Sequence, residues 1–421
     1  MIGIRDVRVL DPAHGRDGRG NLLIADGKIV SIDAKLEAAD GIRILDGHGL
    51  IAAPGLTDVH VHFRDPGLTY KEDIETGAKA AARGGYTRVV CMANTKPVVD
   101  SPEVLAYVLQ KGQKTGIHVE SCACVTEGMK GKKLADMEIL WNLGAAGFTD
   151  DGIPILDEEL LRNAMKKAAS LGAPISLHEE NPAFIENNGI NQGVISERLG
   201  IGGSPALAEV CLVERDCVLA SETGAKVNIQ HISAKGAVEA VRQAKKKGVK
   251  VFAEATPHHY TLTEEAVLDW GTCAKMNPPL RTEADRQSII EGLRDGTIDI
   301  IATDHAPHSQ EEKSRPLTEA PSGIIGLETA LALGITELVK PGYLTLMELM
   351  EKMSKNPAIL YGFDYPGIVP GALADLVIFD ENELWTVDEF ASRAANSPFR
   401  GRTLQGRVHY TICGGKIVYE R

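Results

Sequence analysis

The chain has 421 residues, 43% of them hydrophobic and 24% charged, which is typical of a soluble globular enzyme with one large domain and a smaller unit. Its formal net charge of −13 argues against a nucleic-acid partner and means that an anionic substrate needs a local cation. Seven scattered cysteines, the lack of a signal peptide and the lack of any apolar run of ~18 to 20 residues predict a cytoplasmic protein that does not enter a membrane.

Both ends of the chain consist of short apolar runs joined by turns. The runs are residues 4–10, 20–24 and 28–32 near the start and 375–380, 408–413 and 416–419 near the end. The Asp26-Gly27 pair between two of them predicts a tight hairpin. Because the two ends have the same texture, we expect residues 1–52 and 366–421 to form one composite β-sandwich, with a domain of residues 53–365 inserted between them.

The middle of the chain alternates apolar strand candidates with helical segments rich in Ala, Leu and Lys. The strand candidates are residues 57–62, 86–92, 117–124, 145–149, 174–178, 226–231, 249–255 and 298–303. The helical segments are residues 72–84, 102–114, 157–171, 206–223, 235–247 and 283–295. Eight strands with intervening helices predict an α/β fold, a (β/α)8 barrel of the TIM type, with a distorted or open variant as the alternative.

The first of these strands ends in His60-Val61-His62. Residues i and i+2 of a strand share a face, so both imidazoles should project together, and Arg64 would bring a positive charge to the same face. Two histidines at this spacing occur by chance too often to identify a metal site alone.

Ligand-type residues also end four other strand candidates. They are Asp150 and Asp151 after the fourth, His178 after the fifth, His231 after the sixth and Asp304 after the eighth. Because the carboxyl ends of barrel strands form one rim, we expect these side chains to meet there. A single His or Asp at a strand end is more often structural, but five strands ending in this way predict a site for zinc or a similar divalent ion.

Six motifs make the chain resemble the dihydroorotases, the cyclic amidohydrolases of pyrimidine biosynthesis. They are His60-Val61-His62-Phe63-Arg64-Asp65-Pro66-Gly67, Asn94-Thr95-Lys96-Pro97, Thr149-Asp150-Asp151-Gly152, Pro257-His258-His259, Met276-Asn277-Pro278-Pro279-Leu280-Arg281 and Ala302-Thr303-Asp304-His305-Ala306-Pro307-His308. Together with the terminal segments, the resemblance covers nearly the whole chain. It implies the reversible cyclisation of N-carbamoyl-L-aspartate to (S)-dihydroorotate plus water.

The resemblance also implies one or two Zn²⁺ ions per subunit. His60, His62 and Asp304 would bind one zinc, and His178 and His231 would bind a second. In many relatives a carboxylated lysine bridges the two ions. The fourth strand has no lysine here, so the bridge is expected to be Asp151.

The substrate contacts that the resemblance implies are Arg64, Asn94, Asn277 and His308, with the Ser322-Gly323 backbone. A guanidinium can pair a carboxylate through two parallel hydrogen bonds, which suits Arg64 to both substrates. Asp304 would take a proton from the attacking water and deliver it to the leaving nitrogen. Residues 308–323 form either a flap over the site or an exposed loop.

Two other functions compete with this one. A hydantoinase- or allantoinase-type hydrolase is disfavoured by Arg64 and by the missing lysine in the fourth strand. A non-catalytic subunit of aspartate transcarbamoylase should have lost ligands, and every expected one is present. The resemblance further implies a homo-oligomer, such as a dimer, with aspartate transcarbamoylase as a candidate partner.

Overall fold

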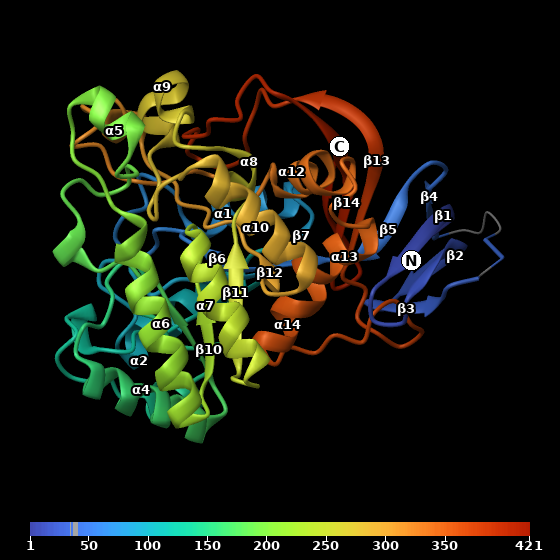
Figure 1. Ribbon diagram of the computed structural model, residues 1–421. Helices are drawn as coiled ribbons and strands as arrows, with labels where there is room; N and C mark the ends of the chain where they lie inside the picture. Colours follow the sequence, from blue (N-terminus) through green and yellow to red (C-terminus); the bar gives the residue numbers. More distant parts are fainter. Residues whose placement is uncertain (34, 37–40) are drawn as a thin grey trace.

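The computed structural model describes residues 1–33, 35–36 and 41–421, and it shows a β unit beside a larger α/β part (Figure 1). Both ends of the chain contribute to the β unit. Its strands are β1 (Ile2–Asp11), β2 (Arg16–Ala25), β3 (Lys28–Ser31), β4 (Arg43–Asp46), β5 (Ile51–Pro54), β13 (Leu376–Thr386), β14 (Thr403–Cys413) and β15 (Lys416–Glu420). They form one sheet in the order β15-β14-β13-β5-β1-β2-β3, with β4 beside β1.

The seam between the two ends is the antiparallel pairing of β5 with β13, in which Ala52 lies opposite Ile378. Side chains from both ends, including Ile4, Leu22 and Ile378, form a common hydrophobic core. The predicted Asp26-Gly27 hairpin is confirmed, because β2 and β3 pair directly across it and both turn residues have positive φ angles, 50° and 78°.

Parallel strands form the centre of the α/β part. They are β6 (Leu56–Val61), β7 (Tyr86–Cys91), β8 (His118–Ser121), β9 (Pro174–Leu177), β10 (Lys226–Ile229), β11 (Val251–Ala255) and β12 (Ile300–Ile301). β6, β7 and β8 make one parallel sheet, and β9 to β12 make another. The fourth expected strand is reduced to parallel bridges from Phe148 to Ala123 and Ile175, which join the two sheets. A further parallel bridge, from Val61 to His305, connects the last segment to the first.

The eight parallel segments therefore follow one another in chain order, as they do in a (β/α)8 barrel. The prediction of a regular strand at 145–149 is wrong. Ala145, Ala146 and Gly147 have low β-propensity and offer little side chain to pack against neighbouring strands.

Helices separate the parallel strands and follow the last of them. They are α1 (Ile74–Arg83), α2 (Pro102–Gly112), α3 (Met137–Asn142), α4 (Glu158–Leu171), α5 (Val194–Leu199), α6 (Ala206–Thr223), α7 (Lys235–Lys246), α8 (Pro257–Thr261), α9 (Ala266–Trp270), α10 (Glu283–Asp295), α11 (Gln310–Lys313), α12 (Ala330–Gly334), α13 (Leu346–Met350) and α14 (Asn356–Tyr361). Short turns of 3-10 helix lie at Glu127–Met129, Pro182–Phe184 and Gly271–Ala274, and π-helical turns lie at Ile335–Val339 and Glu351–Lys355.

Local sequence explains the longer helices. α10 begins at a capping box of Thr282 and Asp285 and ends at Gly296 in the left-handed conformation. α7 buries Val238 and Val241, so its apolar stripe faces the strands. All six predicted helices are present, with ends within two residues of those expected. No helix in the described part of the chain is long and apolar enough to cross a membrane.

Candidate active site

Four imidazoles and two carboxylates meet at the carboxyl ends of the parallel strands. They belong to His60, His62, Asp151, His178, His231 and Asp304, and all six residues are buried. Each comes from the end of its strand or from the residues just after it, which is the rim where barrel enzymes place their chemistry. The structure thus brings together every residue that the sequence predicts as a metal ligand.

The first group lies around His60 and His62. The Nε2 atom of His60 lies 3.4 Å from Asp151 Oδ1 and 3.6 Å from Asp304 Oδ1. The Nε2 atom of His62 lies 2.9 Å from Asp304 Oδ1 and 3.5 Å from Asp151 Oδ2. Although it is buried, the His60 Nε2 atom has no hydrogen-bond partner. A ring nitrogen without a partner that faces two carboxylates fits a divalent cation between these groups.

The second group is formed by His178 and His231. Their Nδ1 and Nε2 atoms are 2.7 Å apart, and they lie 3.7 Å and 3.9 Å from Asp151 Oδ1. The Asp151 carboxylate therefore faces both groups, which is the geometry that its predicted bridging role needs. Three sets of these ligand atoms lie close enough together to hold a metal ion: His60 with His62 and Asp151, His60 with His231 and Asp304, and Asp151 with His178 and His231.

The electrostatics of the cluster also fit a cation. Burial raises the pKa of Asp151, but the charges of His60, His62 and His178 outweigh it and hold the pKa well below its usual value. Burial lowers the pKa of His60, but Asp304 and Asp151 raise it well above its usual value. Positive charge between the two carboxylates is therefore stabilising. A divalent ion would supply that charge while the imidazoles stay neutral.

Glu254 supports His60 from the far side of its ring. Its Oε2 atom lies 2.9 Å from His60 Nδ1, and its Oε1 atom accepts a hydrogen bond of 2.6 Å from Asn228 Nδ2. Histidines that bind metals commonly donate their second ring N–H to such a carboxylate, which orients the ring. Glu254 is not among the residues that the sequence predicts for the site. Its only local signal is an acidic residue within the apolar run of β11.

Replacing Glu254 with glutamine is expected to lower metal affinity or kcat/KM about 10- to 100-fold, because the charge that orients His60 is lost. Metal titration and steady-state kinetics on one preparation measure both quantities. The control is Glu264→Gln, which changes a buried carboxylate that accepts a hydrogen bond from Asn191. The control should leave both quantities unchanged, and equal behaviour of the two variants would contradict the supporting role.

Asn94 contacts the ligands as well as the cavity. Its Oδ1 atom lies 3.0 Å from His62 Nδ1, and its Nδ2 atom donates to Asp151 Oδ2 over 2.9 Å. The same side chain lines the cavity above the cluster. Asn94 therefore contacts two of the predicted metal ligands, in addition to the cavity where its predicted substrate contact lies.

A cavity of about 220 Å³ opens directly above the cluster. Its lining includes the predicted substrate residues Arg64, Asn94, Asn277, His308 and Ser322. Gly323 is not among the lining residues, but it packs closely against the His308 ring. A Cβ atom at Gly323 would lie 2.6 Å from that ring, and its φ angle of 156° also favours glycine.

The spacing of Arg64 from His62 predicts that strand alternation directs the Arg64 side chain to the cavity. In the structure it reaches the cavity by another route. β6 ends at Val61, and Arg64 has a φ angle of 59°. This left-handed conformation turns the side chain toward the segment after β12, where its Nε atom donates to the Pro307 carbonyl and its Nη2 atom lies 3.4 Å from His308 Nε2. The predicted positive charge of Arg64 therefore lies at the cavity, but a turn of the backbone places it there.

His308 lies among cations. Burial and the charges of Arg64 and Lys71 lower the pKa of His308 to about 2, so its ring is neutral at physiological pH. Lys71 Nζ lies 3.3 Å from His308 Nδ1 and 2.8 Å from Glu312 Oε1, and Tyr70 donates a hydrogen bond of 2.9 Å to the same oxygen. Glu312 belongs to α11, so these contacts tie residues 308–323 to the loop after β6. Neither Lys71 nor Glu312 is predicted from sequence, and movement of this segment stays a prediction.

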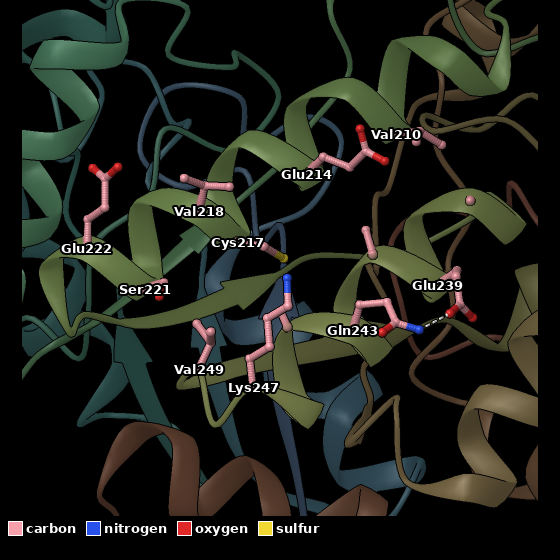
Figure 2. A pocket seen from close by; sticks show the side chains of 13 residues that line it. Val210, Glu214, Cys217, Val218, Ser221, Glu222, Glu239, Gln243, Lys247 and Val249 are labelled. Carbon is pink, nitrogen blue, oxygen red and sulfur yellow. Dashed lines mark hydrogen bonds between the residues drawn. The ribbon is translucent and has the colours of Figure 1, made fainter.

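A larger hollow, of about 600 Å³, lies apart from this chemistry, between α6 and α7 (Figure 2). Its lining combines aliphatic residues, such as Val210, Val218 and Val249, with polar residues that include Glu239 and Gln243. It contains no histidine and none of the residues that the sequence predicts for the site. Size therefore does not identify the active cavity here, whereas the ligand groups do.

Comparison with known proteins agrees with this geometry. Residues 51–418 match the model of the amidohydrolase family. The chain is 56% identical over 419 residues to a dihydroorotase of Clostridioides difficile (strain 630), with 100% of both chains covered. It is 50% identical over 418 residues to a dihydroorotase of Lactococcus lactis, with 99% of each chain covered. Among solved structures it is similar to an L-hydantoinase (dihydropyrimidinase) from Arthrobacter aurescens, with a TM-score of 0.88 and 26% identity, covering 100% of this chain and 96% of the other.

Proposed function

Since the chain belongs to the amidohydrolase family and, within it, to the dihydroorotases, we propose that it reversibly closes N-carbamoyl-L-aspartate to (S)-dihydroorotate plus water, in pyrimidine biosynthesis. The observation that carries the choice of substrate is the Arg64 guanidinium, which lines the same cavity as the imidazole and carboxylate cluster. Both proposed substrates carry a carboxylate that a guanidinium can bind in a planar, bidentate manner.

The proposed metal is zinc, one or two ions per subunit, because imidazole and carboxylate groups are its usual ligands in hydrolases. His60, His62 and Asp304 would hold one ion, His178 and His231 a second, and Asp151 would be shared between them. A divalent cation bound there polarises an amide carbonyl and lowers the pKa of water at the site.

The residues of the chain provide binding and proton transfer. Arg64, Asn277 and His308 line one cavity, where they would hold the substrate carboxylate and orient the carbamoyl group. Asp304 also lines the cavity, and one of its oxygens lies 2.9 Å from His62. We assign the proton transfer to Asp304. During hydrolysis of the ring it accepts a proton from the attacking water and gives it to the ring nitrogen, and cyclisation reverses these steps.

Several features of the protein stay predictions. The barrel is proposed as residues 53–365 and the terminal β-sandwich as residues 1–52 with 366–421. A homo-oligomer such as a dimer, a partnership with aspartate transcarbamoylase and a place in the cytoplasm belong to the same proposal. All seven cysteines are free, which fits a reducing compartment.

The proposed reaction is tested with purified protein and N-carbamoyl-L-aspartate, by following dihydroorotate formation. Hydantoin, allantoin and dihydrouracil are assayed in parallel, because the hydantoinase in the comparison shares the fold. Preference for carbamoyl-aspartate supports the proposal. Turnover of an uncharged ring without turnover of carbamoyl-aspartate would replace it with a hydantoinase or allantoinase activity.

Removing the metal with a chelator is expected to lower activity by at least about 10²-fold, because the cation contributes several kcal/mol to catalysis. Adding back Zn²⁺ should restore activity, and titration should show whether one or two equivalents are needed. Elemental analysis of the same samples is the control. Full activity in protein shown to be metal-free would contradict the proposed cofactor.

A further inference from the structure

A second group of ligand-type side chains lies away from the catalytic rim. It consists of His118, the first residue of β8, Asp375, which precedes β13, and Cys413, the last residue of β14. One ligand atom from each lies within 4.8 Å of the other two. Because the catalytic residues follow the carboxyl ends of the strands, His118 at the amino end of β8 belongs to the opposite face of the α/β part.

The contacts within this group hold the α/β part against the terminal sheet. His118 Nε2 lies 2.9 Å from Asp375 Oδ2, and the other Asp375 oxygen accepts a hydrogen bond of 2.7 Å from the backbone N–H of Gly414. The Cys413 Sγ atom lies 3.6 Å from the carbonyl oxygen of Thr87, the neighbour of Arg88 on β7. Cys413 is buried, while His118 and Asp375 are partly exposed, so an ion could enter from solvent.

A nitrogen, an oxygen and a sulfur ligand form a combination that zinc accepts and that calcium or magnesium does not. We propose that His118, Asp375 and Cys413 bind a divalent cation of the zinc class at the base of the α/β part, distinct from the catalytic cluster. Three protein ligands leave one tetrahedral position for water. A cavity of about 110 Å³, lined by Asp375, Thr87 and Arg88 among others, provides space for that water beside the site.

Arg88 is a cation beside this site, and its charge opposes metal binding. Its guanidinium pairs with Glu120 and stacks 4.5 Å from the centre of the Phe363 ring, so both contacts hold it and Glu120 neutralises it. Burial raises the pKa of the Cys413 thiol, and the incoming cation must displace that proton.

Binding would replace two hydrogen bonds, between His118 and Asp375 and from the Cys413 thiol to the Thr87 carbonyl, with metal bonds from three segments distant in sequence. The ion would join β8 of the α/β part to β13 and β14 of the terminal sheet. The site is therefore structural, and its loss should leave kcat and KM unchanged while lowering the midpoint of thermal unfolding.

Cobalt substitution tests the proposal because it distinguishes the two sites by their ligands. The catalytic cluster contains no sulfur, so a thiolate-to-cobalt charge-transfer band in the near ultraviolet can arise only where a cysteine binds the ion. We expect this band in the cobalt-loaded enzyme, together with one equivalent of cobalt beyond those at the catalytic cluster. In the Cys413→Ser variant the band and that equivalent should disappear while turnover is retained.

The matched control is Cys217→Ser, which changes another buried cysteine, on α6, and should keep the band. His118→Gln removes a partly exposed ligand and should also lose the extra equivalent, which covers the case in which Cys413→Ser fails to fold. Absence of the band from the cobalt-loaded wild type, or its persistence in Cys413→Ser, would overturn the proposal. Turnover of carbamoyl-aspartate is recorded separately and decides the proposed function alone.

Discussion

Replacing Asp304 with asparagine is expected to lower kcat for carbamoyl-aspartate by at least about 10³-fold, near the upper part of the range for general acid–base catalysis. The amide cannot accept a proton from the attacking water, and it is a weaker ligand than the carboxylate. Asp304 Oδ1 lies 2.9 Å from His62 and 3.6 Å from His60, within the cluster, so the substitution should remove both proposed functions of the residue, metal binding and proton transfer.

Two measurements separate these losses. Metal content of the Asp304→Asn protein reports ligation, and the rate with full metal occupancy reports proton transfer. Asp299→Asn is the matched control, because this mostly buried carboxylate precedes β12, pairs with Lys245 and lies at the other end of the same segment. A metal-loaded Asp304→Asn enzyme with turnover close to that of the wild type would show that another group carries the proton.

Replacing Arg64 with alanine is expected to lower kcat/KM about 10²- to 10³-fold, mainly through KM. Truncating one partner of a buried, hydrogen-bonded charge pair costs about 2 to 5 kcal/mol. Arg64 is partly buried and keeps its charge in the pocket, where burial lowers its pKa and Asp304 and Asp151 oppose that effect. Steady-state kinetics with carbamoyl-aspartate and with dihydroorotate measure the loss in both directions.

Arg64→Lys separates charge from geometry, because lysine retains the charge but lacks the planar fork. We expect it to recover only part of the loss. Arg162→Ala, on the surface of α4, should behave as the wild type. An unchanged KM in Arg64→Ala would exclude the residue from carboxylate recognition and would reopen the choice between dihydroorotase and hydantoinase activity.

The histidines and aspartates of the buried cluster could be predicted from sequence because the signal for them is local. An apolar run followed by histidine or aspartate marks a strand end, and the rule that strand ends share one rim brings the residues together. His178 after β9 and His231 after β10 follow this rule, although neither is near the other in the chain. The helices could also be predicted from sequence, because caps such as Thr282 and apolar stripes such as that of α7 depend on only a few neighbouring residues.

Backbone conformation at the site could not be predicted in this way. Within residues 1–33, 35–36 and 41–421, six residues other than glycine have positive φ angles, and Arg64, His231 and Asp304 are three of them. Such conformations cost about 1 to 3 kcal/mol each and persist only where surrounding contacts enforce them. No local sequence pattern predicts these positive φ angles. Strand alternation therefore predicts that Arg64 lies at the cavity but not the backbone conformation that places it there.

The sequence by itself determined the residue types, the order of strands and helices, and the six histidines and aspartates that meet at the rim, because periodicity, caps and strand ends are properties of short segments. Only the tertiary structure decided which groups support those ligands and surround the substrate. His60 and Glu254 are 194 residues apart, and Lys71 and His308 are 237 apart. Their contacts arise where neighbouring parallel segments and the loops above them pack, and a buried charge acquires its role only from the partners that this packing supplies.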